Sequence, residues 1–422
     1  MAARREKTKR ERRSRLTTFR SGTPAVAPRP STMSAIGIEA EFVVVMDGAP
    51  VRPEVVFGSP RRIVRGPLMH RTGRSYHLPT GSAVYFDTGV IELATPMIEI
   101  DRGCAARAGR SLWESILFLR RELDHWQERN GREVRLVGFS THYNVSFDIP
   151  ASDANPSRTV EKLALLLTYL LPAPVMLLAA NRQSTGIGVR PRGNRVEVTA
   201  DFTPDAALMI ATATLVVGIV REVMTWPTYE LSALDAQQQL PRFRHFAPAP
   251  HSSRKGWVAR YSCFPRNPFT SHVDDDRWET QRGESISLRE IAGLVTKHFW
   301  PAIRRYADPF TLRLIGNVMA GRAPSLLELA DRPPAYESVG TLCAWEASLF
   351  PEHELPRSRY ERVLIRAIHG DRLRLDGGET YTPTGMRGWS HVIFRRERDR
   401  SKHVFSLDYL LRHLEDWEAR SR

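Results

Sequence analysis

The stretch Ala35-Ile-Gly-Ile-Glu-Ala-Glu-Phe-Val-Val-Val-Met46 predicts a buried strand that carries two acidic side chains. Asp47-Gly48 predicts a turn directly after it. Glu39 and Glu41 are two positions apart, so on a strand both carboxylates lie on the same face. Two like charges about 4 Å apart repel each other by roughly 4 kcal/mol at an effective dielectric constant near 20. Such a pair needs water, arginines or a cation beside it. Taken alone, the stretch is equally compatible with an edge strand whose acidic face is solvated.

The composition is that of a large globular protein. The 422 residues are 42% hydrophobic and 9% aromatic, which is enough for two or three domains or for one large enzyme domain with insertions. The cysteines, Cys104, Cys263 and Cys343, are far apart and match no CxxC or zinc spacing. This usage fits a reducing compartment, and we expect a cytoplasmic protein.

The net charge of +14 is concentrated at the start of the chain. Residues 1–20 hold nine basic and two acidic side chains, which is half of the net charge, and they lack the apolar segment of a secretory signal. We expect residues 1–34 to form a disordered basic tail and linker, with Met33 as an alternative start. Nucleic acid is therefore expected to bind weakly at most, through this tail.

The next part of the chain predicts strands and helices that carry further polar residues. Residues 47–82 predict short strands at best, and residues 82–96 predict a hairpin that turns at Asp87-Thr88-Gly89. Residues 111–129 predict a helix that Ser111 caps and Gly131 ends. Residues 134–148 predict the strand that follows.

The middle of the chain is strongly apolar. Residues 157–180 approach the length of a membrane span, but Pro172 predicts a break, so we expect a buried core helix and no membrane. Residues 187–199 predict a strand, and Asp205 opens a helix that runs to about Met224.

The last part of the chain is more mixed. Residues 235–284 predict loops that suit a lid or specificity insertion. A helix from Ser287 to Tyr306 starts with a capping box, and residues 361–396 and 407–419 predict a small strand region and a final helix. We expect residues 35–230 to form the core of a catalytic domain and residues 231–422 to continue it with insertions and C-terminal helices.

Polar side chains interrupt four of the predicted buried strands. One such intrusion is ordinary, whereas four in succession predict a shared site on one face of a sheet. Carboxylates and imidazole, without thiolate, are suited to Mg²⁺ or Mn²⁺. The residues are Glu39 and Glu41, Glu92, His142 and Asn144, and Arg195 and Glu197.

Three arginines near this set add donors for phosphate oxygens: Arg190, Arg192 and Arg195. Metal ligands and arginines on one face are typical of sites that transfer a phosphoryl group from a nucleotide. In such sites positioning and charge neutralisation account for most of the rate enhancement. The chain has no Walker A, GxGxxG, GxSxG or HExxH motif, which disfavours the common nucleotide-binding and hydrolase folds.

Four motifs, in this order, resemble the glutamine synthetase and glutamate–cysteine ligase superfamily of carboxylate–amine ligases, including its amidoligase members. The first is Gly37-Ile-Glu-Ala-Glu-Phe42, and the second is Ile91-Glu-Leu-Ala-Thr-Pro96. The third is the histidine strand, Gly138-Phe-Ser-Thr-His-Tyr-Asn-Val-Ser146, and the fourth is Asn194-Arg-Val-Glu-Val-Thr-Ala-Asp-Phe-Thr-Pro-Asp205. The resemblance covers roughly residues 35–225.

The resemblance implies an α+β fold in which helices back a curved antiparallel sheet, with ATP and two or more Mg²⁺ or Mn²⁺ ions bound on the sheet. A carboxylate would attack ATP to give an acyl phosphate, and an amine would then displace phosphate to form an amide. By analogy Glu41 and Glu92 hold one metal, whereas Glu39, His142 and Glu197 hold the other. Glu39 and Arg195 would act in catalysis, and the nucleotide would be bound by Arg190, Arg192, Arg195 and Asn144.

The chain departs from the family in three places. Only a tail and linker precede the first strand, where glutamine synthetases carry a whole domain. Thr199 replaces the second arginine of the fourth motif, and the nearest candidate for a partner of Glu92 in its metal site is Asp87. Residues 226–422 match no motif of the family.

Two other functions stay open from the sequence. A guanidino-kinase-like phosphotransferase would use the same fold without making an amide, and a basic nucleic-acid-binding or scaffold protein would have no ATP turnover. For the ligase we expect small carboxylate and amine substrates, and a homo-oligomer is compatible with the sequence.

Overall fold

The computed structural model describes residues 34–149, 155–203, 205–237, 239–252, 255–328, 355–375 and 377–420. The predicted basic tail, Met33 and Cys343 lie outside these ranges.

A twelve-stranded sheet forms the centre of the fold, and every strand pair in it is antiparallel. The predicted α+β class with an antiparallel sheet is therefore confirmed. Its order is β11-β12-β9-β10-β8-β1-β6-β5-β4-β3, and β2 and β7 pair with the two ends of β1. The bounds are β1 Ala35–Met46, β2 Ala49–Val51, β3 Met69–Thr72, β4 Ser75–His77, β5 Ala83–Asp87, β6 Val90–Ala94, β7 Ile98–Glu99, β8 Val134–Ser146, β9 Ile187–Pro191, β10 Arg195–Asp201, β11 Ala249–Pro250 and β12 Trp257–Ala259.

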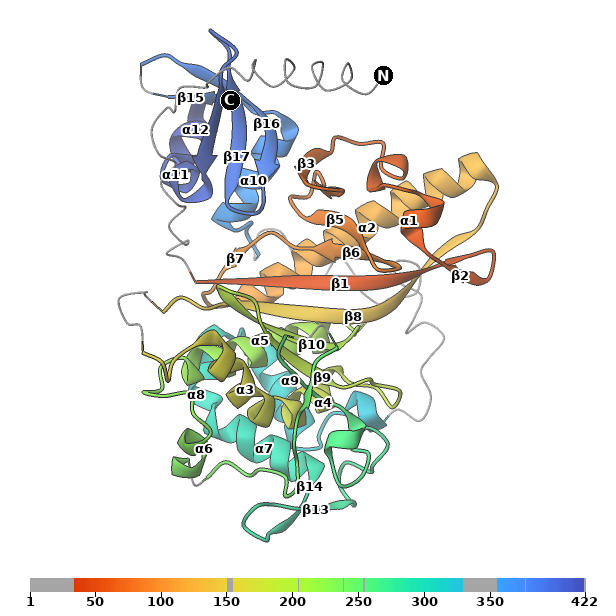
Figure 1. The fold of residues 1–422 in the computed structure, drawn as a ribbon, viewed down its shortest axis with the longest axis vertical. Coiled ribbons are helices and arrows are strands. Elements are labelled where there is room, and N and C mark those ends of the chain that lie inside the picture. The colour runs from red at the N-terminus through yellow and green to blue at the C-terminus, as the bar shows by residue number, and fades with distance from the viewer. Residues whose placement is uncertain are drawn as a thin grey trace, which may run out of the picture. The chain divides into compact units, whose positions relative to one another are not determined.

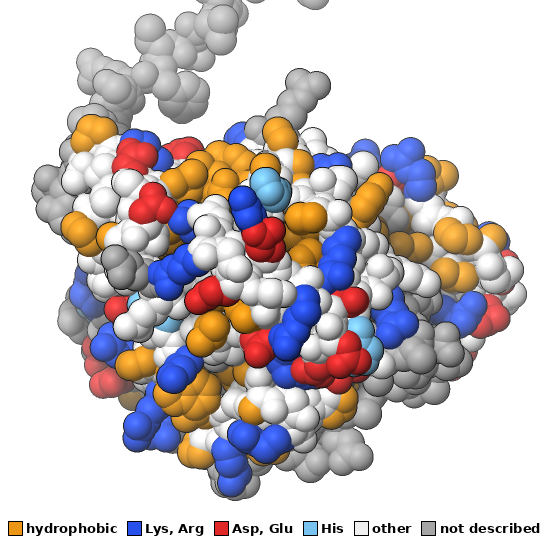
Figure 2. Space-filling model, turned by 90° about the horizontal axis from the view of Figure 1, so that it is seen from below, with side chains coloured by type: hydrophobic (Ala, Val, Ile, Leu, Met, Phe, Trp, Pro, Cys, Tyr) orange, Lys and Arg blue, Asp and Glu red, His pale blue; other side chains and the backbone are white. Residues whose placement is uncertain are grey.

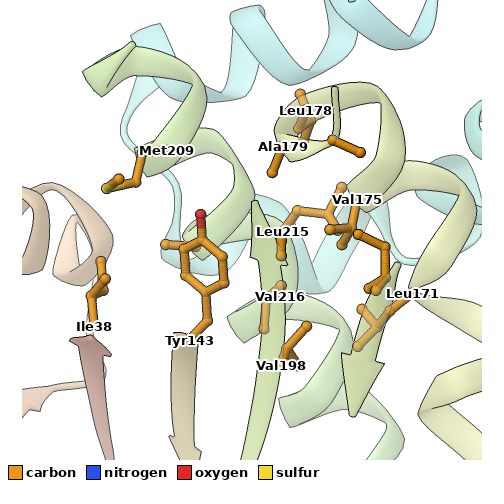
Figure 3. Packing of buried hydrophobic residues seen from close by; sticks show 14 of the residues in the cluster. Ile38, Tyr143, Leu171, Val175, Leu178, Ala179, Val198, Met209, Leu215 and Val216 are labelled. Carbon is orange, nitrogen blue, oxygen red and sulfur yellow. The ribbon is translucent and has the colours of Figure 1, made fainter. Parts of the chain in front are cut away.

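The predicted strand at residues 35–46 is β1, which pairs with both β8 and β6 near the middle of the sheet. Its burial alternates along all twelve residues, so one face is apolar and the other carries the two glutamates. Figure 3 shows Ile38 of β1, Tyr143 of β8 and Val198 of β10 pointing into a layer of helices. The register places these three side chains next to one another.

Helices form two layers on the apolar side of β8 to β10, where Figure 1 shows them gathered together. Met209, Leu215 and Val216 from one helix and Leu171 to Ala179 from another meet the strand residues there. The helices that contact the strands are α3 Val160–Leu170, α4 Pro172–Ala179 and α5 Ala206–Val223. The second layer, α7 Leu288–His298, α8 Trp300–Tyr306 and α9 Pro309–Met319, packs on α4 and α5. The long helix α2, Cys104–Asn130, packs against β1 and α5.

Helix boundaries follow the predicted signals in part. The break before Pro172 is confirmed, with a 65° bend between α3 and α4, and Asp205 caps α5 as predicted by accepting a hydrogen bond from Leu208 N. The predicted cap at Ser111 is wrong: α2 starts at Cys104, and Ser111 is buried inside it. The alanines between 104 and 111 favour helix strongly enough to extend it towards Gly103, whose positive φ of 78° ends the preceding turn.

The predicted helix 287–306 is two helices. The Ser287 capping box is present, but α7 ends at His298. A new helix, α8, begins at Trp300 with Pro301 in its first turn, where the N–H that proline lacks would have no partner inside the helix.

Two helix glycines give opposite expectations for a change to alanine. A Cβ at Gly218 of α5 would lie 2.7 Å from the Ile303 backbone of α8, so Gly218→Ala is expected to destabilise the protein by about 1–3 kcal/mol. A Cβ at Gly293 of α7 meets only Met319 O at 3.5 Å, so Gly293→Ala is expected to stabilise it by about 0.5–1 kcal/mol. Urea unfolding of both variants measures this, and equal effects would contradict the close α5–α8 approach.

Residues 359–420 form a smaller α+β module with its own hydrophobic cluster. The expectation of strands from residue 361 is wrong for its first part, because Ser358 caps helix α10 there. The four-stranded sheet has the order β15-β16-β17-β18. The elements are α10 Arg359–His369, β15 Leu373–Arg374, β16 Thr380–Arg387, β17 His391–Arg396, β18 Lys402–Ser406, α11 Leu407–Arg412 and α12 Leu414–Arg420, with a break at His413 in the predicted final helix.

The predicted loop segment 235–284 contains short elements, and two of them, β11 and β12, extend the main sheet. Strand β12 pairs with β9, and the periodicity of three residues is too short to predict it. The remaining short elements are α1 Pro53–Val56, η1 Pro60–Arg62, α6 Ser232–Ala236, η3 Tyr261–Cys263, β13 Arg277–Glu279, β14 Ser285–Ser287 and η4 Leu326–Glu328.

His77 of β4 lies fully buried against the C-terminal module, with its ring 4.8 Å from the Trp389 ring. Burial and the charge of Arg71 lower the pKa of His77 from 6.5 to about 3. Since the unfolded chain binds this proton more tightly, stability is expected to fall as pH drops from about 6.5 towards 3. In urea titrations, His77→Phe is expected to lose less stability than wild type over that window, and an equal loss would contradict the assignment.

Among the described residues, α5 is the one helix long and apolar enough to cross a membrane, and 83% of its most apolar window is buried inside the protein. The segment for which we predicted a core helix, residues 157–180, is the bent pair of α3 and α4, and most of its residues are buried. On the face drawn in Figure 2, basic and acidic side chains are interspersed over the surface.

Candidate functional site

The register of the central strands brings the predicted polar residues onto one face of the sheet. Glu39 of β1 lies opposite His142 of β8, and Glu41 lies opposite Glu92 of β6. On the other side of β8, Asn144 lies opposite Glu197 of β10. A side-chain period of two then places all of these groups together, away from the helix layer.

Three of these residues converge on one point. Ligand atoms of Glu39, Glu92 and His142 all lie within 4.8 Å of one another. His142 Nδ1 is 3.4 Å from Glu39 Oε2, and its Nε2 is 3.7 Å from Glu41 Oε1. Glu92 and His142 are buried, and the two glutamates of β1 are nearly so. We call Glu39, Glu92 and His142 the ligand cluster.

The two carboxylates of the ligand cluster, Glu39 and Glu92, repel each other when both are ionised. Burial raises the pKa of Glu92, and the charge of Glu39 raises it further, to about 9. Burial also raises the pKa of Glu39, but the hydrogen bond and charge of His142, with Arg195, outweigh it and lower the pKa to about 2. One carboxylate therefore takes up a proton so that the other can stay ionised.

This donor set fits a divalent cation. A cation between the carboxylates and the imidazole would remove the repulsion that protonates Glu92. Oxygen donors with one imidazole and no thiolate match Mg²⁺ or Mn²⁺. Ser140 supports the set, because its hydroxyl donates to Glu41 Oε2 at 2.6 Å and lies 3.2 Å from His142 Nε2.

The predicted arginines lie on the β9–β10 side of the ligand cluster. Arg190 and Arg192 both form ion pairs with Glu197, whose side chain is 1% exposed. Arg195 Nε donates to Asn144 Oδ1 at 2.6 Å. Burial lowers the pKa of Arg190 to about 10. Its Nε is buried and has no hydrogen-bond partner among the described residues, which fits an anion such as a phosphate as its acceptor.

The two predicted metal sets are brought together to different degrees. The register supports the pairing of Glu41 with Glu92 and of Glu39 with His142, whereas Glu197 is engaged by two arginines. Asp87 is exposed at the hairpin turn, where it accepts a hydrogen bond from the Thr88 hydroxyl. The partition of ligands between two metals stays a prediction.

Three residues at the site were missed by the sequence analysis. Tyr85 donates a hydrogen bond to Glu92, and the two-residue turn at Thr88-Gly89 would have predicted this cross-strand pair. Ser140 could have been found at two positions before His142 on the same strand face. Arg71 gave no signal, because it lies in a segment predicted as irregular.

Comparison with known proteins gives structural neighbours only. No protein-family model and no curated protein matches the chain. A crystal structure of the prokaryotic ubiquitin-like protein Pup with its ligase PafA is 12% identical and has a TM-score of 0.48. The match covers 91% of this chain and 93% of the chain in that structure. A PafA structure in complex with ADP has a TM-score of 0.42 at 10% identity, covering 96% and 98%.

A bifunctional glutathione synthetase from Pasteurella multocida is 13% identical, with a TM-score of 0.45, and covers 86% of this chain and 59% of its own length. At these TM-scores the likeness does not decide function. We therefore base the functional proposal on the residues of this chain.

Proposed function

We propose that the chain is an ATP-dependent carboxylate–amine ligase of the glutamine synthetase and glutamate–cysteine ligase type, acting in the cytoplasm. The observation that carries the proposal is the convergence of Glu39, Glu92 and His142 beside a buried arginine whose Nε lacks a partner among the described residues. The curved antiparallel sheet, with metal ligands on one face and helices on the other, is the arrangement that this family uses.

In this proposal the ligand cluster, with Glu41 and Glu197, holds two or more Mg²⁺ or Mn²⁺ ions. Ions bound there would neutralise charge on the transferred phosphoryl group. Arg190, Arg192, Arg195 and Asn144 bind and orient the phosphates of ATP. Glu39 and Arg195 are assigned as the catalytic pair, and the charge of Arg195 acts on the Glu39 carboxylate.

The reaction has two steps. A carboxylate oxygen of the acid substrate bonds to the γ-phosphorus while the bond to the ADP oxygen breaks, which gives an acyl phosphate and ADP. An amine then attacks the acyl carbon, phosphate leaves with the bonding electrons, and the amine loses a proton to give an amide. Holding both substrates on one sheet face makes each step intramolecular in effect.

A substrate screen tests the proposal. Purified protein is incubated with ATP, Mg²⁺, pools of amino acids and small carboxylates, and an amine. We expect ADP release that requires both the acid and Mg²⁺, together with one new amide mass. Acid-independent ADP release, or none with any pool, would contradict a small-molecule ligase.

A further inference from the structure

Arg71, at the end of β3, is held between two aromatic rings. Its guanidinium carbon lies 5.4 Å from the centre of the Tyr85 ring and 5.0 Å from the centre of the Trp389 ring. Its Nε donates to Ser75 Oγ at 2.9 Å. Aromatic rings at these distances attract a cation, and the planar guanidinium of arginine stacks on them in a way that a lysine ammonium does not.

The two terminal nitrogens of Arg71 have no acceptor among the described residues, whereas each of the other three arginines of the site binds a side chain of the sheet through at least one nitrogen. Arg190 and Arg192 bind Glu197, and Arg195 binds Asn144. Arg71 is partly buried, and it is not sealed in the core. A rigid guanidinium fork with free N–H groups matches the two oxygens of a carboxylate.

Arg71 faces the ligand cluster through Tyr85. The Tyr85 hydroxyl donates to Glu92, and the charges of Glu39 and Glu92 act on the Arg71 guanidinium. Arg195 also acts on it, although β10 and β3 are six strand spacings apart in the sheet. On a flat sheet that separation is roughly 29 Å, at about 4.8 Å per strand. The sheet therefore curls between these strands, and in its order β3 and β9, which carry Arg71 and Arg190, lie on opposite sides of β1.

Trp389 is supplied by the C-terminal module. It lies in the turn between β16 and β17, and its ring also makes an edge-on contact with buried His77 of β4. The start of β3 joins the same hydrophobic cluster as the module, through Met69. The module is thus anchored on the strands that present Arg71, and it contributes one of the two rings that hold it.

We propose that Arg71, clamped by Tyr85 and Trp389, binds a carboxylate of the acid substrate, so that residues 359–420 form one wall of the acid subsite. This inference rests on the proposed ligase function for the identity of the ligand. The inference assigns two anion sites on the sheet. The ATP phosphates bind at Arg190 and Arg192, and the carboxylate of the acid binds at Arg71. It also gives the C-terminal module a role in the choice of substrate.

Binding measurements test the inference without turnover. Succinate, L-glutamate and citrate, at matched ionic strength, and separately MgATP, are titrated into wild type and into Arg71→Ala, Arg71→Lys and Trp389→Ala, with calorimetry as the readout. We expect Arg71→Ala to weaken the carboxylate that binds wild type best by about tenfold or more, and to change MgATP affinity by less than about twofold. Arg71→Lys keeps the charge but loses the fork, so it should recover only part of the affinity.

Two matched controls sharpen the test. Arg74→Ala removes an exposed arginine from the adjoining turn and is expected to leave carboxylate affinity unchanged. Trp389→Phe keeps a ring over Arg71 and should bind the carboxylate better than Trp389→Ala. Circular dichroism of each variant excludes loss of the fold as the cause.

Three results would overturn the inference: equal carboxylate affinity in Arg71→Ala and wild type, a loss confined to MgATP, or no wild-type binding of any of the three acids. A loss confined to MgATP would assign Arg71 to a nucleotide phosphate. Carboxylate binding that depends on Arg71, in a protein without ADP release, would contradict the proposed ligase reaction while leaving the anion site in place.

Discussion

Replacing Glu39 or Glu92 by glutamine is expected to lower Mg²⁺-dependent ADP formation by more than about 100-fold while the protein stays folded. Loss of a residue that merely supports a metal ligand costs about 10–100-fold, and both glutamates are assigned as direct ligands. Each side chain lies in the ligand cluster, with donor atoms within 4.8 Å of the other members. Steady-state assays over a range of Mg²⁺ and Mn²⁺ concentrations measure the effect.

Glu128→Gln is the matched control, because it makes the same chemical change at an exposed position of α2. Metal affinity distinguishes a ligand from a scaffold residue: calorimetric Mn²⁺ binding should weaken in both cluster variants and not in the control. Wild-type turnover in either cluster variant would remove that residue from the metal site.

Replacing Glu361 by alanine is expected to lower the free energy of unfolding by about 3–5 kcal/mol, the usual cost of stranding a buried charge. Glu361 is fully buried on α10 and accepts two hydrogen bonds from Arg110 NH2 of α2, at 2.8 and 2.9 Å. Its carboxylate also accepts from Ser358 N, which completes the capping box of α10. Urea unfolding followed by circular dichroism measures the loss.

Exposed Glu415 of α12 provides the control, since Glu415→Ala is expected to change stability by less than about 0.5 kcal/mol. A double variant, Arg110→Met with Glu361→Met, removes both charges and should recover much of the lost stability. A loss below about 1 kcal/mol in Glu361→Ala would show that the pair does not hold the C-terminal module to α2.

The sequence predicted which polar residues share one face of the sheet because strand geometry is simple. Glu39 and Glu41 share a face by their spacing alone, and β-branched neighbours made the strand recognisable. The tight turn at Thr88-Gly89 then fixed the hairpin that carries Glu92. No local signal predicted that β8 and β10 would lie in this order beside β1.

What the sequence did not predict depends on contacts between distant segments. Arg71 is positioned beside the site by the curl of the sheet and by its contact with Trp389, which is more than 300 residues away in the sequence. Strand β12 forms by pairing with β9, and its three residues are too few to show a strand periodicity. Ser111 resembled a helix cap, yet the tertiary contacts of α2 with β1 and α5 favoured a longer helix.

Hydroxylamine trapping tests the central claim most directly, because an acyl phosphate reacts with hydroxylamine to give a hydroxamate. The protein is incubated with ATP, Mg²⁺, the acid selected by the screen and hydroxylamine in place of the amine, and the products are resolved by mass. We expect one hydroxamate for each ADP formed, and neither product with Glu39→Gln. ADP formed together with a phosphorylated acceptor and no hydroxamate would contradict a carboxylate–amine ligase and would assign the site to a phosphotransferase.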